Sequence, residues 1–396
     1  MTKIRSLSLA VLVVALCCAA RLHSQTEVTA PFQLSGGYSY LSNSFNGIPG
    51  ARQALEGWDA AAAFPAWHNL RFKMEVSRYT GTNLGAQQHA IFIMGGGQYE
   101  HKLGKERLFG EALFGECGLN RYWGPQASPG ETASFTSLLG GGADTPVNRH
   151  FALRIEGGFQ YTNFALIKAV TNTTPYKVPG LPNYFGRMSA GIVWTPRLNP
   201  VASEGRSVAR TPPASELYFE DLNSFGHIHI FGNTWWSYLH LAGVEYDRHS
   251  WGKFVGARMD YAAEILPVAI LKQPSKTDVW GNRLSRTFID VPGLGIAPIG
   301  VRLLWRDDKP LEFYYAVKGG MIAFTQKALS QYASYENFSL HQGVGFQLRL
   351  NDRMDLRAGF RDYHFSNGFV VPSNPGIDEM MWNGGVAYRL RGKSER

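Results

Sequence analysis

Side chains of alternating character recur along most of this chain with a period of two. The clearest stretch is 151–162, in which Leu153 and Ile155 alternate with Arg154 and Glu156. Successive side chains of a β-strand point to opposite faces, so such a strand has one apolar face and one polar face. The pattern therefore predicts antiparallel β-structure and an all-β fold.

The strand-like segments fall into two groups. The first comprises eight expected strands, at 32–41, 57–66, 70–80, 88–100, 106–118, 132–143, 150–162 and 186–196. The second comprises 226–247, 251–266, 294–306, 311–325, 335–350, 353–366 and 378–391. Its first segment contains Gly232-Asn233 and is long enough for two strands, which again makes eight. An even number of antiparallel strands of about ten residues is typical of a transmembrane β-barrel.

A polar break separates the two groups. Residues 199–216 are rich in Pro, Ser, Arg and Glu and contain no large apolar side chain before Leu217. This composition is typical of a linker. We therefore expect one eight-stranded barrel at 25–198, a linker at 199–216 and a second eight-stranded barrel at 217–396. A single sixteen-stranded barrel is the alternative architecture.

Residues 1–24 have the features of a secretory signal peptide. Two basic residues precede a mainly apolar run of 14 residues, and small and polar residues follow it. Such a run is too short to span a bilayer as a helix. Cys17 and Cys18 raise the alternative of a lipoprotein, but neither follows the small residue that a lipoprotein signal needs. We expect cleavage near Ala20 or Ser24 and export of the mature chain.

Composition favours a membrane barrel over other exported folds. The chain has 44 Gly, 24 Phe, 18 Tyr and 10 Trp with only 18% charged residues, which suits strands, tight turns and aromatic girdles. The net charge of +8 is dispersed along the chain and suits anionic lipid phosphates, so we expect a bilayer and no nucleic acid as partner. Only Cys117 follows the signal, which predicts a packing role and no intramolecular disulfide.

The first half resembles a known class of barrel. The segment 140–156, beginning Gly-Gly-Gly-Ala-Asp-Thr-Pro, and the ending Ser-Ala-Gly-Ile-Val-Trp at 189–194 resemble small OmpA-like outer-membrane barrels. The resemblance covers about residues 30–197. The resemblance implies a β-barrel fold and gives no indication of a catalytic activity.

One segment near the C-terminus carries side chains of the Ser, His and carboxylate types. On the strands before and after its loop, apolar residues occupy the even positions, so even positions face lipid. His364, Ser366 and Asp378 are all even. Cross-strand neighbours lie about 5 Å apart, which lets the three side chains meet on the outer wall. A serine hydrolase uses a Ser, a His and a carboxylate in this way. The alternative interpretation is that the three residues form a polar rim where a strand runs into a loop.

The same residues form a motif. His-Phe-Ser-Asn at 364–367, followed by Asn-Pro-Gly-Ile-Asp at 374–378, resembles the lipid A 3-O-deacylase family of outer-membrane barrels. Members of that family have a His-x-Ser-Asn motif and an acid fourteen residues after the His, which is the spacing found here. The resemblance covers about residues 217–396.

The resemblance implies a role for each residue of the motif. Ser366 would be the nucleophile, His364 the base, Asp378 the orienting acid, and Asn367 with a backbone N–H near Gly368 or Phe369 the oxyanion hole. The family's acid is usually Glu, whereas this chain has Asp378 with Glu379 beside it. The family's Gly two residues after the Asn is Phe369 here.

These features predict an outer-membrane esterase that removes an ester-linked acyl chain from lipid A of lipopolysaccharide. No cofactor and no metal are expected, because His227 and His229 have no third ligand at a recognisable spacing. The alternative function is a non-enzymatic structural, adhesion or small-pore barrel. The sequence leaves the acyl position, the role of the N-terminal barrel and the oligomeric state open.

Overall fold

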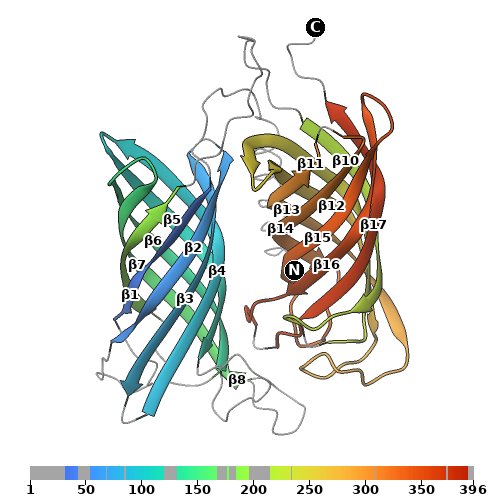
Figure 1. The fold of residues 1–396 in the computed structure, drawn as a ribbon. Coiled ribbons are helices and arrows are strands. Elements are labelled where there is room, and N and C mark those ends of the chain that lie inside the picture. Colours follow the sequence, from blue (N-terminus) through green and yellow to red (C-terminus); the bar gives the residue numbers. More distant parts are fainter. Residues whose placement is uncertain are drawn as a thin grey trace, which may run out of the picture.

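The fold is known from a computed structural model, and the regular elements of the residues that it describes are all strands (Figure 1). The structure describes residues 32–42, 54–67, 69–83, 86–119, 132–166, 176–177, 184–195, 215–232, 234–307, 309–371 and 373–390. Within these ranges no helix is long and apolar enough to cross a membrane. The expected signal peptide and most of the expected linker lie outside the described residues.

The N-terminal half forms a closed antiparallel barrel. Its strands are β1 (Gln33–Leu41), β2 (Leu55–Trp67), β3 (Leu70–Asn83), β4 (Ala86–Leu103), β5 (Glu106–Leu119), β6 (Thr132–Pro146), β7 (Phe151–Leu166) and β9 (Tyr184–Trp194), with a two-residue strand β8 (Tyr176–Lys177) added to β7. Each of the eight long strands pairs with a neighbour on both sides, and β1 closes the ring through β9.

The C-terminal half forms a second closed barrel. Its strands are β10 (Ser215–His227), β11 (Tyr238–Phe254), β12 (Ala257–Pro274), β13 (Phe288–Trp305), β14 (Leu311–Phe324), β15 (Glu336–Arg349), β16 (Met354–Ser366) and β17 (Ile377–Leu390). The ring closes because β10 pairs with β17. The expectation of two eight-stranded barrels is confirmed, and the sixteen-stranded alternative is wrong.

The start of this second barrel differs from the sequence prediction. The expected strand pair 226–247 instead comprises the last residues of β10, a loop at 228–237 and the first part of β11. Strand β10 begins at Ser215, inside the expected linker. The alternation of apolar and polar residues in β10 is irregular, because the polar residues Asp221 and Asn223 are exposed on the outer face while Glu220 is buried on the inner face.

Connections of very different length lie at the two ends of the C-terminal barrel. At one end, here called the turn end, the strands are joined by 255–256, 306–310 and 350–353. At the opposite end, the loop end, the connections are 228–237, 275–287, 325–335 and 367–376. Short turns on one side and long loops on the other are usual for outer-membrane barrels.

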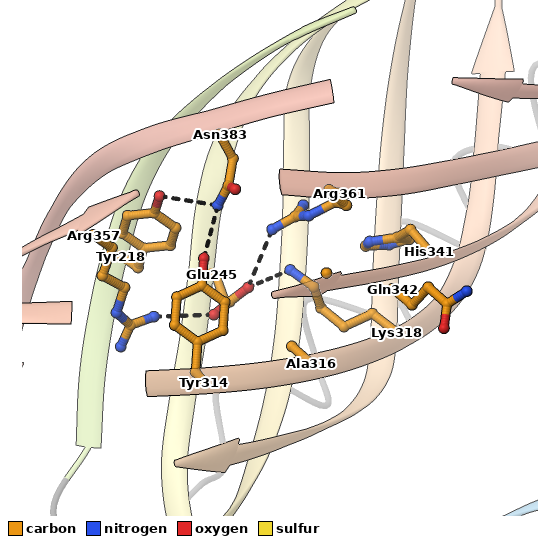
Figure 2. A pocket seen from close by; sticks show the side chains of 11 residues that line it. Tyr218, Glu245, Tyr314, Ala316, Lys318, His341, Gln342, Arg357, Arg361 and Asn383 are labelled. Atoms are coloured by element: carbon orange, nitrogen blue, oxygen red, sulfur yellow. Dashed lines mark hydrogen bonds and ion pairs between the residues drawn. The ribbon is translucent and has the colours of Figure 1, made fainter. Parts of the chain in front are cut away.

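Side chains fill the lumen of the C-terminal barrel. Towards the loop end the inner wall is apolar, with a cluster that includes Leu241, Leu271 and Phe365. Further in, charged side chains pair across the lumen, as Figure 2 shows for Glu245 between Lys318, Arg357 and Arg361. The cavity among these side chains measures about 10 Å³, which is room for about one water molecule. This cavity is too small for a substrate.

Candidate active site

Strands β16 and β17 present their even-numbered residues to the outside of the barrel. On β16, Leu356 and Phe360 are 40% and 41% exposed, whereas Arg357 is buried in the lumen. On β17, Trp382 is 54% exposed and Met381 is buried. The predicted outward orientation of the even positions of both strands is therefore confirmed.

The structure brings Ser366, His364 and Asp378 together at the loop end of this wall. His364 and Asp378 are directly opposite each other in the β16–β17 pair. His364 Nδ1 lies 2.5 Å from Asp378 Oδ1, and His364 Nε2 lies 3.3 Å from Ser366 Oγ. With the proton on Nδ1, the imidazole donates to the carboxylate and accepts from the serine hydroxyl.

The carboxylate of Asp378 is fixed through both of its oxygens. Oδ2 accepts backbone N–H groups from Ile230, Phe231 and Gly232 at 2.7, 2.8 and 2.8 Å. The 228–237 loop covers Asp378, which has no exposed surface. Three N–H donors stabilise the charged form of a buried carboxylate, so Asp378 remains a hydrogen-bond acceptor for His364.

Glu379, the neighbouring acid, lies on the opposite face of the strand. It accepts a hydrogen bond from the Ser224 hydroxyl, and its Oε2 lies 3.3 Å from His227 Nδ1. Its side chain is fully buried on the inner side of the wall. Of the two acids, Asp378 is therefore the one in contact with His364.

The residues expected to form an oxyanion hole lie in a tight turn directly after Ser366. Val370 N donates to Asn367 O at 3.1 Å, and the two central residues, Gly368 and Phe369, have φ of +58° and +59°. Positive φ at both central positions is characteristic of a type I′ turn. The Asn367 side chain is buried and donates to Ser373 O at 2.7 Å. The Asn367 side chain thus links the beginning of the 367–376 loop to Ser373 within it.

Two contributors to the site were not among the expected site residues. The first is the backbone of 230–232, which was not predictable because N–H groups exist in every segment of chain. The second is Gly376, where an added Cβ would lie 3.2 Å from His364 Cε1 and 3.3 Å from Ser366 Cβ. The absence of a side chain at Gly376 leaves space against the His–Ser pair.

Buried acid clusters with the spacing of metal ligands surround lysine side chains in both barrels. Three glutamates converge in each lumen, namely Glu75, Glu111 and Glu156 in one and Glu220, Glu245 and Glu264 in the other. Lys73 Nζ lies 2.9 to 3.1 Å from the first three, and Lys318 contacts the second three. The lysine ammonium groups thus supply the positive charge at the centre of each cluster.

The architecture and the comparisons agree on the class of the molecule. Closed antiparallel barrels with an apolar outer wall and a charged lumen are the architecture of bacterial outer-membrane proteins. Residues 228–387, which contain Ser366, His364 and Asp378, match the family model described as Lipid A 3-O-deacylase (PagL). The C-terminal barrel therefore resembles this family, as its motif predicted. No curated protein matches the chain.

Among solved structures, the chain is similar to several barrels at low sequence identity. Neisserial surface protein A is 14% identical, and the match covers 41% of this chain and 96% of that one with a TM-score of 0.33. The ferric enterobactin receptor of Pseudomonas aeruginosa is 10% identical, with coverage of 92% and 81% and a TM-score of 0.23. The CymD monoaromatic hydrocarbon channel is 8% identical, with coverage of 92% and 89% and a TM-score of 0.17.

Proposed function

We propose that this protein is a bacterial outer-membrane esterase that hydrolyses an ester-linked acyl chain of lipid A. The observation that carries the proposal is the continuous hydrogen-bonded series from Asp378 through His364 to Ser366 on the lipid-facing wall. The family match over 228–387 supports lipid A as the substrate. The N-terminal barrel takes a membrane-anchoring role in this proposal.

Each of the three side chains has a role in the proposed reaction. His364 Nε2 takes the proton of Ser366 as Oγ attacks the acyl carbonyl carbon, and Asp378 stabilises the resulting imidazolium. The imidazolium then gives its proton to the departing sugar oxygen, which leaves an acyl-serine and a free hydroxyl. Water, deprotonated by His364, attacks the acyl-serine and releases the fatty acid. The proton held by His364 returns to Ser366 Oγ, which restores the site.

The position of the site suits a lipid substrate. Ser366 and His364 are partly exposed on the outer wall, and the His364 side chain retains 15% of its surface. Unpaired polar groups facing hydrocarbon cost several kcal/mol each, so this hydrogen-bonded set belongs at the rim of the bilayer. Phe225, Phe360 and Trp382 contact one another further down the same wall and are exposed to the acyl region. A lipid could therefore reach Ser366 without leaving the membrane.

The proposal is tested on lipid A from cells that express the full chain. Mass spectrometry is expected to show the loss of one hydroxyacyl chain, and Ser366→Ala is expected to restore the full mass. Ser285→Ala, a change in the 275–287 loop, serves as the control and is expected to behave as wild type. Unchanged lipid A with a folded wild-type barrel, or deacylation that persists in Ser366→Ala, contradicts the proposal.

A further inference from the structure

We propose that the segment Ile230–Gly232 is the positioning element of the active site, holding the short Asp378 side chain in the orientation that His364 requires. This inference rests on the proposed function. It assigns a role to the 228–237 loop and explains how an aspartate serves where the related family usually has a glutamate.

Opposite sides of the Asp378 carboxylate have different partners. Oδ1 faces His364 Nδ1, while Oδ2 accepts all three N–H groups of the segment. A carboxylate held through one oxygen can still rotate about its terminal bond. With three donors on the second oxygen, rotation would break at least one hydrogen bond to a buried charge, so Oδ1 stays directed at the imidazole.

Further hydrogen bonds attach the loop to Asp378 and to Gly376, just before strand β17. Ile228 N donates to Asp378 O at 3.2 Å. Thr234 donates to Gly376 O twice, through its backbone N–H at 3.0 Å and its hydroxyl at 2.7 Å. These bonds flank the Ile230–Gly232 segment on both sides. The segment is therefore fixed relative to β17 as a unit.

Close approach of the loop depends on Gly232. A Cβ at this position would lie 2.6 Å from Ile377 Cα and 2.8 Å from Asp378 N, which are backbone atoms that cannot move aside. Any side chain would therefore push the segment away from Asp378. Gly226, a few residues earlier on β10, has no atom within 4 Å of an added Cβ. The chain thus offers a matched pair of glycines for a test.

The side chains of the segment face outward. Ile230 and Phe231 are 49% and 55% exposed, and the Phe231 ring centroid lies 5.5 Å from that of His364. The segment consequently separates the buried carboxylate from the membrane, and its apolar side chains face the membrane. Burying those groups in lipid favours the position in which the N–H groups meet Asp378.

The test compares Gly232→Ala with Gly226→Ala in the full chain, using purified lipopolysaccharide in micelles. Gly232→Ala is expected to lower kcat about 100-fold with little change in KM, because the acid is misplaced but the lipid-binding wall is intact. Gly226→Ala is expected to retain wild-type kinetics. Migration on unheated gels, which differs between folded and unfolded barrels, reports folding for each variant.

A double-mutant comparison distinguishes positioning from a general loss of structure. In the Asp378→Asn background, Gly232→Ala is expected to cause no further loss, since both changes act on one interaction. Thr234→Val provides a second, milder variant if Gly232→Ala does not fold, with an expected loss of about 10-fold in kcat that also disappears in Asp378→Asn.

Wild-type kinetics in a folded Gly232→Ala, or a Thr234→Val loss that persists undiminished in Asp378→Asn, overturns the inference. Either result leaves the proposed function standing when the wild-type chain is active and Ser366→Ala is not. A wild-type chain that is folded and inactive contradicts the proposed function itself, so the two failures are distinguishable.

Discussion

Asp378 and His364 face each other across the β16–β17 strand pair, with Oδ1 of the acid 2.5 Å from Nδ1 of the imidazole. Direct opposition is the closest placement that two antiparallel strands allow on one face. An aspartate can therefore reach the histidine here without the extra methylene of a glutamate.

Removing the charge of Asp378 should affect activity more than removing the charge of Glu379. Asp378→Asn is expected to lower kcat by about 10⁴-fold, because an amide at this position no longer selects the productive tautomer of His364. Glu379→Gln is expected to retain most activity, since its carboxylate lies on the inner face beside Ser224 and His227. Steady-state deacylation rates of the two variants test which acid supports His364. Full activity in Asp378→Asn together with loss in Glu379→Gln would show that the acid has been misassigned.

Filling the space next to His364 and Ser366 should lower the catalytic rate. Gly376→Ala adds a methyl group 3.2 Å from His364 Cε1, so we expect the imidazole to shift and kcat to fall about 10-fold. Gly384→Ala, on the following strand β17, meets only Arg357 O at 3.9 Å and is the control. Equal rates in the two variants would show that the gap at Gly376 has no catalytic importance.

The turn between β11 and β12 contains a correctable backbone strain. Val255 has φ of +49° and Gly256 has φ of +75°, a combination in which a β-branched residue is unfavourable. Val255→Asn is expected to stabilise the barrel by about 1 kcal/mol, because Asn tolerates the left-handed conformation. Urea unfolding in lipid vesicles measures the change. Activity should not change, since the turn lies at the end of the barrel opposite Ser366.

The lysine in the lumen should matter for stability more than a lysine on the rim. Lys318→Met leaves Glu220, Glu245 and Glu264 without their central ammonium group, so we expect a loss of about 3–5 kcal/mol. Lys272→Met, at an exposed position of β12, is expected to change stability by less than about 0.5 kcal/mol. Unfolding midpoints that are equal for the two variants would contradict a structural role for the ion cluster.

Alternation along the chain, together with the polar break at 199–216, predicted two barrels, and alternation predicted the outward orientation of the even positions near the site. Lipid selects apolar side chains at every second residue, so this signal extends over whole strands such as β16. It failed at β10, where exposed Asp221 and Asn223 interrupt the apolar face.

The site was predictable to the extent that side chains define it. Parity and spacing placed His364, Ser366 and Asp378 on one face, and the structure brings these three side chains into contact. The donors on Asp378 were not predictable, because backbone N–H groups leave no mark in a sequence and the 228–237 loop was expected to be strand.

The filled lumen of the C-terminal barrel has a kinetic consequence. With the interior closed by ion pairs and apolar side chains, the outer wall is the surface from which Ser366 can be reached. In the proposed reaction, enzyme and substrate therefore meet by lateral diffusion in a plane. The rate should follow the mole fraction of substrate among the surrounding lipids, and dilution of the bulk suspension should leave it unchanged.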